Sequence, residues 1–93
     1  MDLRKRFGEG LRRARKSRGL SQEDFSIVSS RTYLSSLERG MKYPTIEKIE
    51  QLATTIGIHP LTLLALAYVS DGGDDVVSLC NRIVEEVNTL SAS

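Results

Sequence analysis

The fold of this 93-residue chain is decided by the stretch Gly19-Leu-Ser-Gln-Glu-Asp-Phe-Ser-Ile-Val-Ser-Ser-Arg-Thr-Tyr-Leu-Ser-Ser-Leu-Glu-Arg-Gly40. It contains two predicted short helices that are joined by a tight turn. Ser21 is a typical N-cap for the first helix, because Asp24 follows three positions later and can complete a capping box. Ser29 or Ser30 can cap the second helix. The stretch therefore predicts a pair of helices held at a defined angle.

The second helix of this stretch, residues 31–39, has two faces of different chemistry. Leu34 and Leu37 lie one turn apart on an apolar face, whereas the other side chains are mostly hydroxyls and cations and few are strong helix formers. A helix in the major groove of DNA needs hydrogen-bonding side chains on one face and an anchor on the other. The leucines supply the anchor, and the predicted base-reading residues are Arg31, Thr32 and Ser36. The helix that begins at Gln22 can direct free amides at a phosphate.

Helical spacing continues on both sides of the stretch, and no window shows the alternation that is typical of a strand. We predict helices over residues 2–18, 21–28, 31–39, 46–56, 60–69 and 75–90. His59 is predicted to cap the helix over 60–69 or to lie on the surface, and Asp71-Gly-Gly-Asp-Asp75 to form the turn before the last helix. The predicted class is all-α, with five helices in one domain and an added C-terminal helix.

The formal net charge of +1 conceals a strong segregation of charge along the chain. Residues 1–45 contain eleven Lys or Arg against five Asp or Glu, a net charge of +6. Residues 46–93 contain two against seven, a net charge of −5. Such asymmetry indicates a negatively charged partner for the N-terminal half.

Composition argues against several other classes of protein. No apolar run approaches the roughly 20 residues of a membrane span, and the N-terminus lacks a signal-peptide pattern, so we expect a cytoplasmic protein. The single cysteine, Cys80, allows no internal disulfide, and the single histidine, His59, has no companions at metal-ligand spacing. The chain has no convergent set of His, Cys and acidic residues, so we expect no enzyme activity, metal or cofactor.

Four segments match the pattern of a known family. They are Phe7-Gly-Glu-Gly-Leu-Arg-Arg-Ala-Arg15, Gly19-Leu-Ser-Gln-Glu23, Leu34-Ser-Ser-Leu-Glu-Arg-Gly40 and Pro44. Over residues 3–66 the chain resembles helix-turn-helix proteins of the phage-repressor type, the Cro and C1-like or XRE family. Residues 31–40 are especially similar to the controller proteins of restriction–modification systems. The chain departs from the family pattern between Leu20 and Gly40, where it is shorter and has Ile27-Val-Ser-Ser30 in place of the usual turn glycine.

The resemblance implies a role for each matching residue. It implies that the bases are contacted by Arg31, Thr32 and Ser36. It also implies that the sugar–phosphate backbone is contacted by Gln22, Ser30, Tyr33, Arg39, Lys42 and Tyr43. Tyr33 can instead pack beneath the turn. Arg15 and Glu38 match an internal ion pair of the family, which ties the first helix to the third and fixes their relative orientation.

The two C-terminal helices carry more apolar surface than a bundle of this size can bury. Residues 60–69 are apolar nearly all round, and residues 75–90 carry a broad stripe near heptad spacing. We expect residues 1–69 to form the DNA-binding domain and residues 70–93 to extend it for two-fold dimerisation. The predicted dimer contacts are Leu61, Leu64, Tyr68, Val76, Cys80, Ile83 and Val87. Alternatively, the last helix only covers its neighbour within one monomer.

These features together predict a sequence-specific transcriptional regulator, most simply a repressor. It would bind double-stranded DNA as a homodimer on a palindromic operator, with recognition helices about 34 Å apart. Neither a small-molecule ligand nor a membrane is expected. The alternative is an antitoxin that binds DNA as a dimer and neutralises a toxin through its acidic C-terminal helix.

Overall fold

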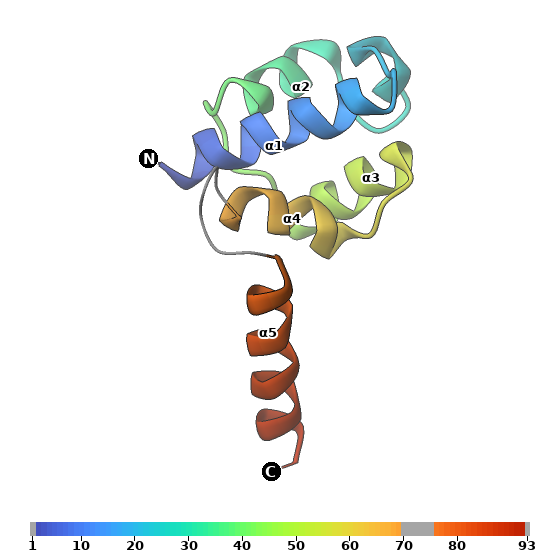
Figure 1. Cartoon of the computed structure of the whole chain (residues 1–93). Helices are drawn as coiled ribbons and strands as arrows, with labels where there is room; N and C mark the ends of the chain where they lie inside the picture. Colours follow the sequence, from blue (N-terminus) through green and yellow to red (C-terminus); the bar gives the residue numbers. More distant parts are fainter. Residues whose placement is uncertain (1, 70–75, 93) are drawn as a thin grey trace.

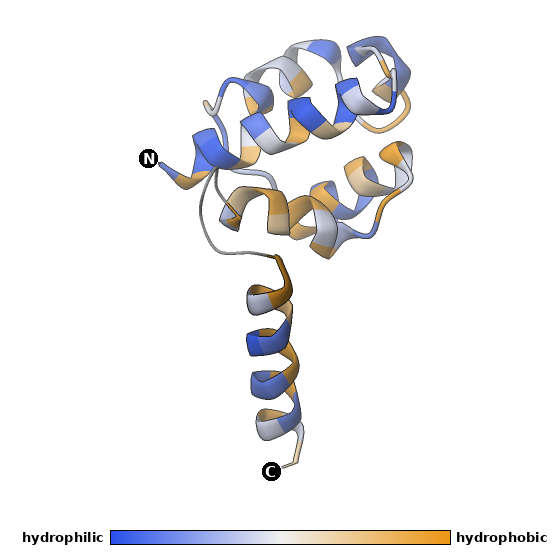
Figure 2. Ribbon diagram, viewed as in Figure 1, coloured by the Kyte–Doolittle hydropathy of each residue, from blue (hydrophilic) through white to orange (hydrophobic). Residues whose placement is uncertain are grey.

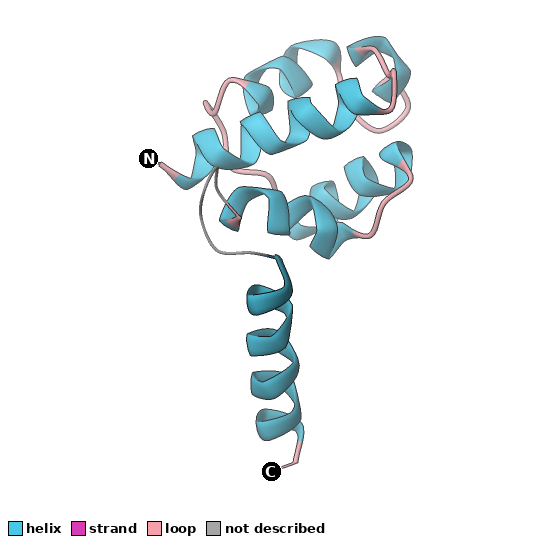
Figure 3. Cartoon of the chain, in the orientation of Figure 1, coloured by secondary structure: helices cyan, strands magenta, loops and turns pink. Residues whose placement is uncertain are grey.

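A computed structural model describes residues 2–69 and 76–92 of the chain, and within these ranges every regular element is helical (Figures 1 and 3). The elements in chain order are α1 (Leu3–Ser17), the 3-10 helix η1 (Gln22–Phe25), α2 (Arg31–Glu38), α3 (Ile46–Ile56), α4 (Pro60–Tyr68) and α5 (Val76–Ser91). The prediction of an all-α fold is therefore confirmed. The predicted turn at residues 71–75 lies outside the described residues.

Side-chain caps begin five of these elements, which is why their N-terminal boundaries follow the sequence pattern closely. The Nδ1 atom of His59 accepts the Leu61 amide at 3.0 Å, so this histidine is a helix cap. The other capping side chains are Asp2, Ser21, Ser30 and Thr45. Gly57 ends α3 in the left-handed region at φ +87°, where a residue without a Cβ has no steric penalty.

The second predicted helix, over residues 21–28, is wrong in length, because the structure has only the single turn η1 there. The amides of Val28 and Ser29 both donate to the Phe25 carbonyl at 2.9 Å. The helix ends at this pair of hydrogen bonds. Among the described residues only glycines have positive φ, so the turn needs no left-handed residue. This conformation explains how the shorter segment dispenses with a turn glycine.

A second interaction holds this turn from a distant part of the chain. The Lys48 ammonium group of α3 donates a hydrogen bond to the Val28 carbonyl. The same group lies 5.7 Å from the centroid of the Tyr33 ring, within the range of a cation–π interaction. Lys48 thus fixes the segment between η1 and α2 through contacts that no local sequence rule could predict.

The core is formed where α1 packs against α2 on one side and α4 on the other, with α3 packed on α4 (Figure 1). Gly8 and Gly10 allow these close approaches. A Cβ on Gly8 would lie 2.4 Å and 2.6 Å from the carbonyl oxygens of Leu37 and Glu38, so no side chain fits between α1 and α2. The apolar core comprises Phe7, Leu11, Phe25, Leu34, Leu37, Ile49, Leu52, Ala53, Ile56, Leu63 and Ala67.

Helix α5 extends away from this bundle (Figure 1), and none of its described side chains is buried. Figure 2 shows apolar residues along one side of α5 and polar residues along the other. Leu61 and Tyr68 of α4 remain 61% and 57% exposed, so α5 does not cover them within one chain. The predicted apolar surplus is therefore present on the monomer.

No single helix in the described ranges is both long and apolar enough to cross a membrane. Helices α3 and α4 meet the length and composition criteria only as a pair that is bent by 104°. Leu52 of α3 and Leu63 of α4 are buried in the core, whereas Ile46, Leu61 and Tyr68 of the same pair are exposed.

Candidate nucleic-acid interface

A buried ion pair sets the orientation of α2. The Arg15 side chain donates to Glu38 through Nε at 2.6 Å and through a terminal nitrogen at 3.0 Å, and the two side chains are only 10% and 5% exposed. The hydrogen bonding of Arg15 to the Glu38 carboxylate is the main reason that the pKa of Arg15 is raised above its ordinary value. Gln22 donates to the same carboxylate at 3.2 Å. The Glu38 carboxylate thus joins α1, η1 and α2, the helix that carries the predicted base-reading residues.

The outward face of α2 brings together four of the predicted DNA-contacting residues. Together with Ser35 they line a polar hollow of about 420 Å³; the predicted members are Gln22, Arg31, Thr32 and Arg39. Arg31 and Thr32 are exposed in the first turn of α2, and Arg39 follows the last turn. The inward face of the same helix is held by Leu34 and Leu37, which are fully buried. The helix therefore has an anchored face and a free polar face.

Ser36 does not lie with this group. It is 8% exposed and lies outside the residues that line the hollow, whereas Ser35 lies inside it. Ser35 follows Arg31 by four positions and precedes Arg39 by four, so all three share one side of the helix. The family pattern pointed to Ser36, but this i, i+4 spacing is the signal that could have identified Ser35.

Ser30 and Tyr33 are partly committed to structural contacts. The Ser30 hydroxyl oxygen accepts the Tyr33 amide at 3.1 Å, which leaves its hydrogen available to a phosphate. Tyr33 is half-buried against the core and lies beside Lys48. Of the two alternatives for Tyr33, a contact to the DNA backbone or packing beneath the turn, the structure has the packed arrangement.

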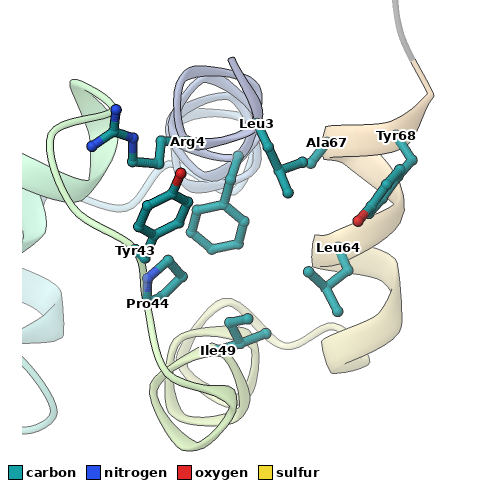
Figure 4. A pocket seen from close by; sticks show the side chains of 9 residues that line it. Leu3, Arg4, Tyr43, Pro44, Ile49, Leu64, Ala67 and Tyr68 are labelled. Carbon is teal, nitrogen blue, oxygen red and sulfur yellow. The ribbon is translucent and has the colours of Figure 1, made fainter.

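Lys42 and Tyr43 are exposed in the loop after α2. The Arg4 guanidinium group of α1 lies 4.8 Å from the centroid of the Tyr43 ring (Figure 4). A hydrogen bond with Asp2 raises the pKa of Arg4 and holds its side chain in place. Arg4 thereby extends the cationic surface beside this loop onto the first turn of α1.

The predicted dimer residues lie mostly on open surface. Leu64 is half-buried and, with Tyr68, lines an apolar hollow of about 130 Å³ between α1, α3 and α4 (Figure 4). Those on α5 are all exposed and lie at a spacing of three or four residues: Val76, Cys80, Ile83 and Val87. The described part of the chain holds no group of three or more His, Cys, Asp or Glu that could bind a metal.

Two short elements joined by a turn, with an anchored and outward-facing second helix, define a helix-turn-helix DNA-binding domain. Residues 11–63 match the helix-turn-helix family profile, and the chain belongs to this family of the XRE type. The family resemblance seen in the sequence is therefore confirmed, and so are its DNA-binding and regulatory character.

Known proteins similar to the chain include one relative by sequence and two solved structures. An uncharacterized HTH-type transcriptional regulator, y4dJ from Sinorhizobium fredii, is 41% identical over 66 residues, which cover 69% of this chain and 86% of that protein. The restriction–modification controller protein C.AhdI from Aeromonas hydrophila has a TM-score of 0.61 at 35% identity, covering 64% of this chain and 94% of that one. The clp gene regulator ClgR from Corynebacterium glutamicum has a TM-score of 0.69 at 25% identity over 98% and 95% of the two chains.

Proposed function

We propose that this chain is a sequence-specific transcriptional repressor that binds a palindromic operator as a homodimer. The observation that carries the proposal is the exposed pair Arg31 and Thr32 on a helix whose other face is buried. The similar proteins support it, because they are named as a transcriptional regulator, a restriction–modification controller and a gene regulator. Residues up to about 69 form the DNA-binding part, and α5 belongs to a dimerisation element.

The chemistry of the outward face suits the major groove. An arginine can donate two hydrogen bonds to O6 and N7 of a guanine, and a threonine methyl can contact a thymine methyl. Arg31 is the natural candidate for the first contact and Thr32 for the second. Gln22 and Arg39 line the hollow on this face, and Lys42 is exposed in the loop that follows α2. All three would fix the position of the helix through phosphates, which carry no sequence information.

The base-reading role predicts an effect that depends on DNA sequence. Arg31→Ala should lose about 1–3 kcal/mol of discrimination at one base position in each half-site. Lys42→Ala is the matched control, because it should weaken binding to operator and random DNA by similar factors. Both can be measured by competition binding after the operator has been selected from a random pool. An unchanged ratio of operator to random affinity in Arg31→Ala would contradict the assignment.

The homodimer is proposed from the exposed stripe of α5. Val76, Cys80, Ile83, Val87 and Leu90 follow each other at steps of four and three, the spacing of a coiled-coil seam. An isolated helix of 16 residues is only marginally stable in water. Because α5 buries no side chain against its own bundle, a second copy of α5 is the simplest source of its stability. Two such domains would present two recognition helices to successive turns of DNA.

The single cysteine provides a direct test of the proposed dimer. In a parallel pair each seam residue faces its own counterpart, so oxidation should join Cys80 to Cys80 of the second copy. Ile83→Lys should reduce the mass in solution to that of a monomer at micromolar concentration, because it would bury two like charges in the seam. Asn81→Lys, on the opposite face of α5, is the control and should remain dimeric. A monomeric wild-type protein would rule out the dimer.

The antitoxin function remains the second candidate, because α5 is free of the bundle and exposes both an apolar stripe and acidic residues such as Glu85. Such a surface could bind a toxin in place of a second α5. Co-purification with a toxic protein expressed beside it, at the expense of the homodimer, would favour this function.

A further inference from the structure

A second polar hollow lies beside the reading face, between α1 and α2. Its volume is about 410 Å³, and it is lined by Arg12, Arg15, Lys16, Gln22, Ser35, Glu38 and Arg39. Three of these residues, Gln22, Ser35 and Arg39, also line the hollow that contains Arg31 and Thr32. The two hollows are therefore adjacent and share one rim.

The charge in this second hollow is strongly positive. Glu38 is its only acidic residue, and both of its carboxylate oxygens already accept hydrogen bonds from Arg15. The positive charges of Arg12, Lys16 and Arg39 are then left over, and none of these three forms an ion pair within the part of the chain that the structure describes. An anion is the ligand that this arrangement favours.

The positions of Arg12 and Lys16 make them available to such a ligand. They are exposed and lie four residues apart, so they project from the same side of α1. Arg39 faces them from the end of α2, with its Nε donating to the Ser35 carbonyl at 3.4 Å. An arginine can bind two phosphate oxygens at once, and a lysine adds a point charge. The lining contains no aromatic side chain on which a base or sugar ring could stack.

We propose that this hollow binds a phosphate of the DNA strand that borders the bases read by α2, with Arg12 and Lys16 of α1 as its ligands. The inference rests on the proposed function, since it needs DNA in contact with α2. It makes α1 part of the contact surface, whereas the backbone contacts predicted from the sequence include no residue of this helix. The shared rim supports this placement, because a backbone running past Arg39 would enter both hollows.

The salt dependence of binding tests the site. Arg12→Gln and Lys16→Gln should each remove one phosphate contact per protomer, so the slope of log K against log salt should fall by about 1.8 for a dimer. If the curves converge near 1 M salt, this corresponds to roughly 30-fold weaker binding at 0.15 M. The loss should be equal for operator and random DNA. Thermal unfolding of each variant should match the wild type, because both side chains are exposed.

Arg13→Gln is the matched control, because Arg13 is adjacent on α1 and lines a different hollow with Ile56 and Thr62. Its slope should remain close to that of the wild type. Equal slope changes for the substitutions at positions 12, 13 and 16 would show only a general charge effect and would overturn the proposal. A protein that prefers no DNA sequence would instead contradict the proposed function.

Neutral methylphosphonate linkages, introduced one at a time into the operator, identify the phosphate concerned. One position in each half-site should weaken binding of the wild type and have no further effect on the double variant Arg12→Gln with Lys16→Gln. Equal losses in both proteins at every position would overturn the inference, even if an operator is selected normally. A further outcome would also overturn the inference. If inorganic phosphate binds saturably through Arg12 and Lys16, but the variants at these positions keep the wild-type salt slope for DNA, the hollow is a site for a free anion.

Discussion

Replacement of Glu38 by alanine should lower the free energy of unfolding by about 3–5 kcal/mol, because it leaves the Arg15 guanidinium group buried without its counter-charge. Arg15 is only 10% exposed at its side chain, and its Nε and a terminal nitrogen both donate to Glu38. An arginine cannot escape this penalty by losing its proton. Because small domains are only 5–15 kcal/mol more stable than their unfolded chains, urea unfolding should show a much lower midpoint.

The paired substitution Arg15→Met with Glu38→Leu separates the charge from the packing. It replaces the ion pair by apolar side chains of similar size and should recover most of the stability, since such replacements are often neutral or stabilising. It should nevertheless weaken discrimination between operator and random DNA, because α1, η1 and α2 lose the carboxylate that orients them. Wild-type stability in Glu38→Ala would show that water or another anionic group compensates Arg15.

Gly8→Ala should destabilise the fold by about 3 kcal/mol, at the upper end of the effects of overpacking. The added Cβ would lie 2.4 Å and 2.6 Å from two backbone carbonyl oxygens of α2, and backbone cannot rotate out of the way as a side chain can. Helix α1 would have to move away from α2, which would also disturb the adjacent ion pair. Thermal unfolding, followed by circular dichroism, measures the loss.

Gly10→Ala provides the comparison for this effect. Its Cβ would lie 2.9 Å from the Cβ of Leu66 on α4, and the next nearest atom is 3.5 Å away, so the overlap is smaller than at Gly8. We expect a smaller loss than at Gly8. In a helix without such contacts both substitutions would add about 0.5–1 kcal/mol of stability, because alanine has the higher helix propensity. A stabilising Gly8→Ala would therefore disprove the close approach of α1 and α2.

Features that depend on neighbouring residues could be predicted from the sequence. Ser21 with Asp24 and Ser30 before Arg31 marked helix starts, because capping involves residues only a few positions apart. The Arg15–Glu38 pair is long-range, and only the family resemblance pointed to it. The leucines of α2 indicated its inward face for the same local reason as the caps.

Features that depend on tertiary contacts escaped prediction. The single turn of η1 depends on hydrogen bonds that converge on the Phe25 carbonyl and on Lys48, which reaches back from α3 to Val28. The hollow beside Arg12 is lined by residues of α1, η1 and α2 that are far apart in the sequence. Periodicity identified the stripe on α5, but it could not decide whether that stripe covers α4 or faces outward, since both arrangements need the same spacing.

The two faces of α2 have different consequences for protein engineering. Arg31 and Thr32 are exposed and Ser35 is half-buried outside the core, and substitutions at surface positions usually change stability by less than about 0.5 kcal/mol. These three positions can therefore be randomised together in a library while the opposite face, with Leu34 and Leu37, keeps the scaffold folded. Variants selected in this way would show how far one small helical framework can be retuned toward new target sites.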